Sequence, residues 1–310
     1  MRRACHCRRS ALSAENRNYD EAARITGRSF LFQPEHERVM YELARRTAAH
    51  DTVVDVDGIR IGDGFTVIAG PCAIEDEIQI ETVARAVRAH GGALLRGGAF
   101  KPRTSPYSFQ GLGERGVELI AQASRHYRLP AVVEALDIEQ LPLLAQQVGM
   151  IQIGARNMQN FALVKAAART GRPLLLKRGP AATLDELLYA AEYALLEGNA
   201  NVVLCERGVR GFDPHTRNLF DLAGALRLKE LTHLPVIVDP SHATGRRSLV
   251  APLVLASAAA GLDGAIIEVH PEPERSLSDA DQAIDLDAFA ALMRGLELIA
   301  PSKVASLAGR

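Results

Sequence analysis

Short apolar runs alternate eight times with longer stretches rich in Ala and Leu, and this alternation constrains the fold more than any other feature of the sequence. The runs are rich in β-branched residues and occupy 65–69, 93–96, 131–134, 150–153, 173–177, 202–206, 235–239 and 264–269. The stretches long enough for helices occupy 80–90, 116–127, 138–148, 161–170, 184–197, 219–232, 247–260 and 286–299. Eight strands, each followed by a helix, over roughly 230 residues predict an α/β protein with a single (β/α)8 barrel, the TIM barrel.

Two doubly wound sheets are the competing interpretation, because 310 residues also suit two domains. No G-x-G-x-x-G motif follows the first apolar run, so we reject a dinucleotide-binding fold. The preceding segment, TVVDVDGIRIGDG (52–64), alternates apolar and polar residues around Asp57-Gly58. This pattern predicts a β-hairpin, which we place as a plug at the bottom of the barrel.

The expected organisation has three parts. Residues 1–50 form a short N-terminal extension of unknown function, with a helix over 34–49, where apolar residues recur at helical spacing. Residues 51–300 form the barrel with its hairpin, and residues 301–310 form a C-terminal tail.

Charge and composition exclude several classes of function. The chain has 36 Lys and Arg against 37 Asp and Glu, a net charge of −1, which argues against a surface for nucleic acid or for anionic membranes. No apolar run approaches the roughly 18 residues that a membrane span needs, and four cysteines do not make a disulfide framework. We therefore expect a cytoplasmic protein with small-molecule partners.

A mixed set of possible metal ligands follows three neighbouring strands. Cys72 comes after the first strand, His242 after the seventh, and Glu268 and Asp279 at and after the eighth. The carboxyl ends of all barrel strands meet at one face, so these side chains are expected to converge. One thiolate, one imidazole and two carboxylates suit a divalent metal of borderline softness. The set leaves Mn²⁺, Fe²⁺, Co²⁺ and Zn²⁺ open.

Cations form a second group at the same barrel mouth. They follow the second, fourth, fifth and sixth strands: Arg96, Lys101, Arg103, Arg156, Lys177 and Arg207. Six positive charges around one mouth repel one another unless an anion shares the space. Arg and Lys in such a place predict binding of phosphate and carboxylate groups.

Long motifs at these residues resemble one enzyme family over residues 51–298, in the right order. The motifs are IAGPCAIED (68–76), RGGAFKPRTSPYSFQG (96–111), QIGARNMQNF (152–161), LLKRG (175–179), CERG (205–208), VDPSHATG (238–245) and EVHP (268–271). The sequence is similar to the 3-deoxy-D-arabino-heptulosonate 7-phosphate (DAHP) synthases of the type I beta subgroup.

The resemblance implies a transferase, 3-deoxy-7-phosphoheptulonate synthase. It would condense phosphoenolpyruvate with D-erythrose 4-phosphate, the first step of the shikimate pathway, which leads to chorismate and the aromatic amino acids. By resemblance, the metal ligands are Cys72, His242, Glu268 and Asp279. Phosphoenolpyruvate would be held by Arg96, Lys101, Arg156, Lys177 and Arg207. The aldose and its phosphate would be received by Lys101, Pro102, Arg103, Thr104 and Ser105. The candidates for proton transfer and other catalytic roles are Lys177, Glu134, Lys101, His242 and Asp239.

Two alternatives stay open. The first is the sister synthase that makes 3-deoxy-D-manno-octulosonate 8-phosphate from arabinose 5-phosphate on the same barrel. Its aldose loop usually reads KANRSS, whereas this chain has KPRTS at 101–105, which favours the four-carbon aldose. The second is a barrel without activity that serves as a scaffold, although no ligand or cation of the expected set is missing.

The sequence departs from the family pattern at several positions. Asp281 follows soon after Asp279 and is a rival metal ligand, while Pro180 and Gly211-Phe212 are atypical. Residues 1–50 match neither the ferredoxin-like nor the chorismate mutase domain of many relatives. We therefore expect no inhibition of the isolated enzyme by phenylalanine or tyrosine, which a rate assay with either amino acid would check. By resemblance, a homodimer or homotetramer is expected, and a trans-acting regulator is left open.

Overall fold

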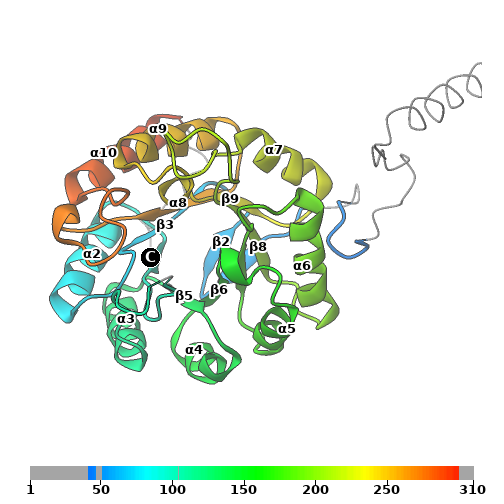
Figure 1. Cartoon of the computed structure of the whole chain (residues 1–310), viewed down its shortest axis with the longest axis horizontal. Coiled ribbons are helices and arrows are strands. Elements are labelled where there is room, and N and C mark those ends of the chain that lie inside the picture. The colour runs from blue at the N-terminus through cyan, green and yellow to red at the C-terminus, as the bar shows by residue number, and fades with distance from the viewer. Residues whose placement is uncertain (1–40, 47–50, 104, 300–310) are drawn as a thin grey trace, which may run out of the picture. The chain divides into compact units, whose positions relative to one another are not determined.

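Eight parallel strands close into a barrel with helices around its outside (Figure 1), as the sequence predicts. The computed structural model describes residues 41–46, 51–103 and 105–299. Each strand pairs with the next along the chain, and the last pairs with the first through the register Gly264 to Thr66. The strands are β3 (Thr66–Gly70), β4 (Leu94–Arg96), β5 (Ala131–Ala135), β6 (Met150–Ile153), β7 (Leu174–Lys177), β8 (Val202–Glu206), β9 (Val236–Val238) and β10 (Gly264–Glu268).

A helix or a helical segment follows each barrel strand. The longer helices are α2 (Glu77–Ala89), α3 (Glu114–Tyr127), α4 (Leu141–Gln147), α5 (Phe161–Arg169), α6 (Leu184–Leu196), α7 (Leu222–Leu231), α9 (Arg247–Ala259) and α10 (Leu286–Ile299). Polar side chains cap the N-termini of several helices. At α6, for example, Thr183 and Glu186 form a reciprocal capping box. Among the described residues, no helix has both the length and the apolar character that crossing a membrane would require.

Several helical details differ from the prediction. The expected helix over 138–148 begins as the 3-10 helix η1 (Ile138–Gln140), and α4 starts only where a proline occupies its first turn. The expected helix over 219–232 begins at Leu222, because Leu219 instead forms a bridge with Val209. A five-residue helix, α8 (Pro240–Thr244), directly follows β9 and was not predicted, since one turn shows no apolar periodicity.

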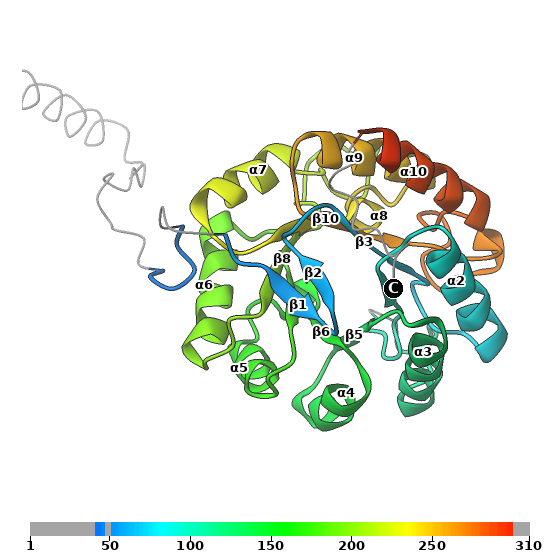
Figure 2. The same ribbon diagram turned by 180° about the vertical axis from the view of Figure 1, so that it is seen from behind.

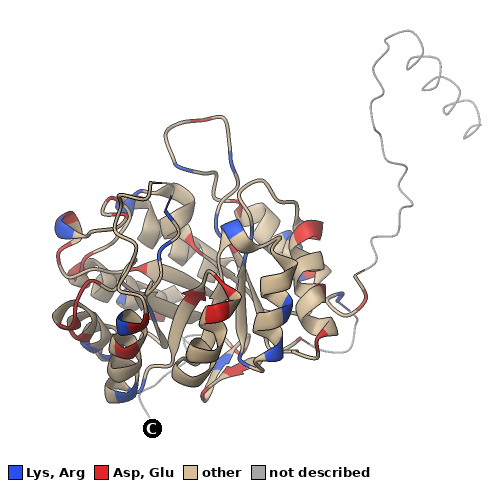
Figure 3. Ribbon diagram, turned by 60° about the horizontal axis from the view of Figure 1, so that its bottom comes forward, with Lys and Arg blue, Asp and Glu red and all other residues tan. Residues whose placement is uncertain are grey.

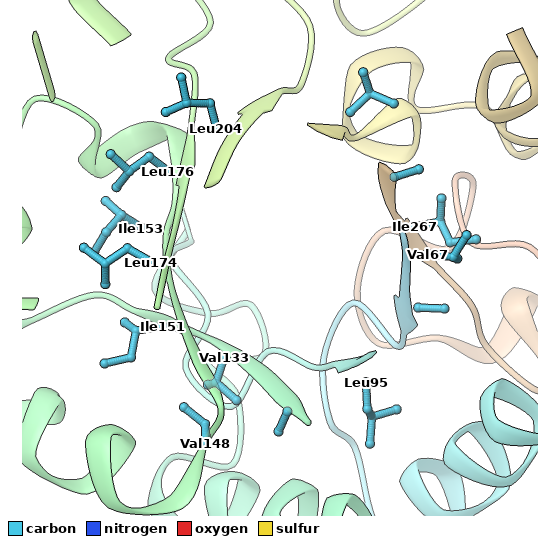
Figure 4. Packing of buried hydrophobic residues seen from close by; sticks show 14 of the residues in the cluster. Val67, Leu95, Val133, Val148, Ile151, Ile153, Leu174, Leu176, Leu204 and Ile267 are labelled. Atoms are coloured by element: carbon cyan, nitrogen blue, oxygen red, sulfur yellow. The ribbon is translucent and has the colours of Figure 1, made fainter. Parts of the chain in front are cut away.

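The barrel has two apolar layers because successive strand residues face opposite sides. One set packs between the strands and the helices, including Val67, Leu95, Ile151 and Ile267 (Figure 4). The other set fills the barrel interior with buried side chains from every strand: Ile68, Leu94, Val132, Met150, Leu175, Val203, Cys205, Ile237 and Ile266. The interior is therefore a packed core that leaves only the mouth for chemistry.

The predicted hairpin is confirmed, with antiparallel strands β1 (Val54–Val56) and β2 (Ile59–Ile61). Asp57 (φ 49°) and Gly58 (φ 92°) both have the positive φ that a tight hairpin turn needs. Val54, Val56 and Ile61 are fully buried and belong to the interior cluster. Figure 2 shows the hairpin lying across the end of the barrel, which it plugs as expected.

The helix predicted over 34–49 is wrong at residues 41–46, which are irregular and form a bridge from Arg45 to Thr232. Here the backbone amides of Glu42, Leu43 and Ala44 donate to the carboxylate of Glu192 at 2.8–2.9 Å. These bonds satisfy a carboxylate on α6 instead of the i to i−4 carbonyls of a helix. The rest of the predicted helix, residues 1–40 and the tail 301–310 lie outside the described residues.

We expect Ile68→Ala to lower the free energy of unfolding by about 2–5 kcal/mol, because it leaves a cavity in the barrel interior. Ile68→Val should cost only about 1 kcal/mol. Urea unfolding followed by circular dichroism measures both. The control is Ile78→Ala on α2, where the side chain is 80% exposed and the change should stay within about 0.5 kcal/mol. Equal costs at the two positions would contradict the assignment of Ile68 to the core.

Candidate active site

A cavity of about 600 Å³ opens where the barrel strands end. All six cations predicted for the mouth line it, and Arg210 and Arg217 join them. Only two carboxylates, Glu134 and Asp279, belong to the same lining. On the outer helices, by contrast, positive and negative residues are intermixed (Figure 3). The near-neutral chain therefore concentrates positive charge in one concave place.

The four predicted metal ligands converge beside this cavity. One ligand atom each from Cys72, His242, Glu268 and Asp279 lies within 4.8 Å of all the others. They come from the loop after β3, from α8, from the last residue of β10 and from the loop before α10. Cys72 and Glu268 are buried, and the other two are partly exposed. Asp281, the rival ligand, is exposed and not part of this group.

Hydrogen bonds and ion pairs hold the group together. The Cys72 thiol donates to Asp279 Oδ2 at 3.2 Å, and Lys101 Nζ lies 3.1 Å from the same sulfur. Glu268 Oε1 lies 2.7 Å from Arg96 Nη1 and 3.2 Å from His242 Nε2. The four possible ligand atoms thus face one small volume, and the buried Lys101 and Arg96 contact two of them.

The environment shifts the pKa values of these groups in opposite directions. Burial and the charge of Glu268 raise the pKa of the Cys72 thiol to about 12, so an incoming metal must displace its proton. Burial alone would raise the pKa of Glu268 as well. The positive charges of His242, Arg96 and Lys101 outweigh that effect and lower it to about 2. Glu268 is therefore ionised at neutral pH.

Asp239 connects His242, one of the four predicted metal ligands, to Lys177. One of its oxygens, Oδ2, lies 2.8 Å from His242 Nδ1 and 2.5 Å from Lys177 Nζ. Burial would raise the pKa of Asp239, but His242 and Lys177 hold it well below its ordinary value. A carboxylate that is hydrogen-bonded to Nδ1 orients the imidazole, so that Nε2 faces the other three predicted metal ligands.

Glu134 lies on the cavity wall and is partly exposed. Its Oε2 accepts a hydrogen bond of 3.1 Å from Gln152 on the neighbouring strand. A β-carbon at Gly154 would lie 1.9 Å from Glu134 Oε1, so any larger residue there would force this carboxylate to move. Lys177 lines the same cavity.

The predicted aldose loop lies at the cavity rim. Pro102 and Ser105 line the cavity, and the Pro102 carbonyl accepts from Arg156 Nη1 at 2.5 Å. Arg103 donates to the Phe109 carbonyl, while its buried Nη2 has no hydrogen-bond partner among the described residues. Thr104 lies outside the described residues.

The prediction missed several polar residues of the site. Gln152, Arg210, Arg217 and Asn218 line the cavity, and Gln282 contacts Glu268 behind it. Arg210, Arg217 and Asn218 belong to the long loop after β8, where no strand end fixes a position in advance. The atypical Pro180 also lines the cavity, whereas Phe212 is fully exposed.

The sequence pattern of the DAHP synthetase I family matches residues 46–299. The chain belongs to this family. A phospho-2-dehydro-3-deoxyheptonate aldolase from Thermotoga maritima is 46% identical over 83% of this chain and 77% of the relative. The enzyme is therefore a DAHP synthase, a transferase. The 2-dehydro-3-deoxyphosphooctonate aldolase of Magnetococcus marinus is more distant, at 29% identity over 79% of this chain and 92% of the relative.

Solved structures agree with this assignment. A crystal structure of the Thermotoga maritima DAHP synthase superposes with a TM-score of 0.82 at 45% identity and covers 86% of this chain and 78% of that one. A truncated form of a DAHP synthase from the same organism gives 0.78 at 41% identity, covering 84% and 97%. The match confirms the single barrel.

We expect the metal-free protein to lose stability as the pH falls below 4.5, because the pKa of Glu268 is about 2 in the folded chain and 4.5 ordinarily. A depressed carboxylate stabilises the fold above its unfolded pKa and loses this effect on protonation. At neutral pH the contribution is about 3 kcal/mol. Urea unfolding between about pH 3 and pH 6 should show Glu268→Gln approaching the parent protein toward acid. If the difference in free energy of unfolding between the two proteins does not become smaller toward acid, the lowered pKa of Glu268 is contradicted. Glu230→Gln, at an exposed position, serves as the control.

Proposed function

We propose that this DAHP synthase condenses phosphoenolpyruvate with D-erythrose 4-phosphate to give DAHP and inorganic phosphate, the first step of the shikimate pathway. One observation supports these roles: the four predicted metal ligands lie beside a cavity that is lined by unpaired cations. Among the described residues, Arg103, Arg156, Arg207 and Arg210 form no ion pair. Two phosphorylated substrates would supply the missing negative charge.

A divalent metal would be held by Cys72, His242, Glu268 and Asp279. One sulfur, one nitrogen and two carboxylate donors within 4.8 Å fit such an ion, and their mixed softness admits Mn²⁺, Fe²⁺, Co²⁺ or Zn²⁺. When bound, the metal would act as a Lewis acid toward the aldehyde oxygen of the aldose. Asp239 keeps His242 oriented for this role through the Nδ1 contact of 2.8 Å.

Phosphoenolpyruvate would be bound by Arg96, Lys101, Arg156, Lys177 and Arg207. The two most buried of these, Arg96 and Lys177, are paired with Glu268 and Asp239. Arg156 and Arg207 carry charge without a carboxylate partner among the described residues, so they would supply most of the net attraction. Arg guanidinium groups can bind phosphate or carboxylate oxygens in pairs.

The aldose and its phosphate would lie along Lys101, Pro102, Arg103, Thr104 and Ser105. The buried Nη2 of Arg103, which lacks a hydrogen-bond partner among the described residues, supports a ligand at this place. The KPRTS loop and the identity to the DAHP synthase of Thermotoga maritima favour the four-carbon aldose over arabinose 5-phosphate.

Bond formation would begin with attack of carbon three of phosphoenolpyruvate on the aldehyde carbon. Carbon two then becomes electron-deficient and adds water, which loses a proton. Lys177 and Glu134, which face the same cavity, are the groups that would manage this proton. The resulting hemiketal phosphate expels inorganic phosphate by carbon–oxygen cleavage. The aldehyde oxygen becomes an alkoxide as the carbon–carbon bond forms and then takes up a proton. Lys101, His242 or Asp239 would hold or transfer that proton.

We also propose a cellular location and an oligomeric state for the enzyme. We place it in the cytoplasm, where its phosphorylated substrates are made, and we infer a homodimer or homotetramer.

The direct test is consumption of phosphoenolpyruvate with each aldose phosphate. We expect turnover with erythrose 4-phosphate, far slower turnover with arabinose 5-phosphate, loss of activity with a strong chelator, and recovery on adding Mn²⁺ or Co²⁺. Equal turnover of both aldoses would overturn the substrate assignment. Activity that resists the chelator, with no metal left by elemental analysis, would overturn the metal site.

Lys177→Met should lower kcat by about 10²–10⁴-fold, because it removes a proton-transfer group and a cation from the cavity. Steady-state rates measure the change, and circular dichroism confirms folding. The matched control is Lys229→Met, which removes a lysine paired with Asp263 away from the cavity lining and should keep kcat within about threefold. A folded Lys177→Met enzyme with parental kcat would remove Lys177 from the chemistry.

A further inference from the structure

We infer that Gln282 is a positioning residue of the proposed metal site, where its side chain fixes the carboxylate of Glu268 and ties it to the turn that carries Asp279. The inference rests on the proposed function of this group as a metal site. It assigns to Gln282 the orientation of one ligand and the spacing of two.

The contacts of Glu268 show why its second oxygen needs a donor. Glu268 is fully buried, and its Oε1 faces Arg96 Nη1 at 2.7 Å and His242 Nε2 at 3.2 Å. Its Oε2 accepts a hydrogen bond of 2.6 Å from Gln282 Nε2. With donors on both oxygens, the carboxylate cannot rotate about its last bond without breaking one of these interactions.

The backbone connects Gln282 to the other acidic ligand. The amide of Gln282 donates to the carbonyl of Asp279 at 3.2 Å, which closes the turn from 279 to 282. Asp279 itself has φ 54°, an uncommon backbone conformation for a residue other than glycine. One end of Gln282 thus closes the turn of Asp279, while its side chain reaches Glu268. The distance between two ligands on separate segments is set through this residue.

A role in packing alone does not account for an amide here. Gln282 is fully buried, and its Oε1 has no hydrogen-bond partner among the described residues. A buried acceptor without a partner destabilises the fold, so packing alone would favour an apolar side chain of similar shape. The useful part of the amide is the nitrogen that faces Glu268.

The test compares the metal affinity of Gln282→Met, which keeps the shape and loses the donor, with that of the parent protein. Metal-free protein is titrated with Co²⁺, and the thiolate-to-cobalt absorption band and a competing chelating indicator give the dissociation constant. We expect Gln282→Met to bind Co²⁺ about 10–100-fold more weakly, the usual cost of losing a group that orients a ligand.

The matched control is Asn199→Leu. Asn199 is a buried amide that donates to the carbonyls of Ala168 and Arg172 before β8, at the opposite end of the barrel. This variant should keep Co²⁺ affinity within about threefold, even if its melting temperature falls. Equal weakening in both variants would show general loosening of the fold and overturn the inference.

Two further outcomes are informative. A Gln282→Met protein that binds Co²⁺ as tightly as the parent, with the same absorption band, would overturn the role of Gln282. If Gln282→Met does not fold, Gln282→Asn keeps the amide on a shorter side chain and is judged by the same criterion. A parent protein that takes up no stoichiometric Co²⁺ would instead count against the proposed metal site.

Discussion

The barrel mouth depends on a row of paired side chains in which His242 links two buried ion pairs. Lys177 pairs with Asp239, Asp239 contacts His242, His242 contacts Glu268, and Glu268 pairs with Arg96. A single buried charge would cost several kcal/mol. The buried charges of Lys177, Asp239, Glu268 and Arg96 are tolerable because each is paired with an opposite charge. The row crosses from β7 through α8 and β10 to β4, so it forms only when the barrel has closed in its observed register.

This row also divides the cations of the mouth into two kinds. Arg96 and Lys177 are already neutralised by the protein and act as fixed parts of the wall. Arg103, Arg156 and Arg207 remain without carboxylate partners among the described residues and leave an unbalanced charge. Removing that imbalance with a carboxylate from the protein would stabilise the empty cavity and weaken attraction for phosphorylated substrates. The cavity therefore carries uncompensated positive charge, which its phosphorylated substrates can neutralise.

The sequence predicts the fold well because each strand is buried on both faces. Strands with this burial appear as continuous apolar runs, and the predicted bounds lie within one or two residues of the observed ones. The strand ends place Cys72, His242 and Glu268 at one face from topology alone. Asp279 lies in the loop after the eighth strand, eleven residues beyond Glu268, and its role as a ligand was expected from the family resemblance.

The residues that were missed share a physical property. Gln282, Arg217 and Asn218 act through side-chain contacts that arise only when distant loops meet, and no periodicity encodes such contacts. The segment at 41–46 was predicted as helix from apolar spacing, but its amides are bound by Glu192, about 150 residues further along the chain. The spacing of apolar residues cannot reveal a hydrogen-bond acceptor that lies so far away in the sequence.

The binding of backbone amides by Glu192 has an evolutionary consequence. Glu192 binds the main-chain amides of residues 42–44, and the Thr232 hydroxyl binds the carbonyl of Ala44, so these bonds do not depend on the exposed side chains of Glu42 and Leu43. Tyr41 and Ala44, by contrast, are buried in the core. Substitutions at 42 and 43 should therefore be tolerated, whereas those at 41 and 44 are restricted by packing, so the attachment can persist while its surface changes.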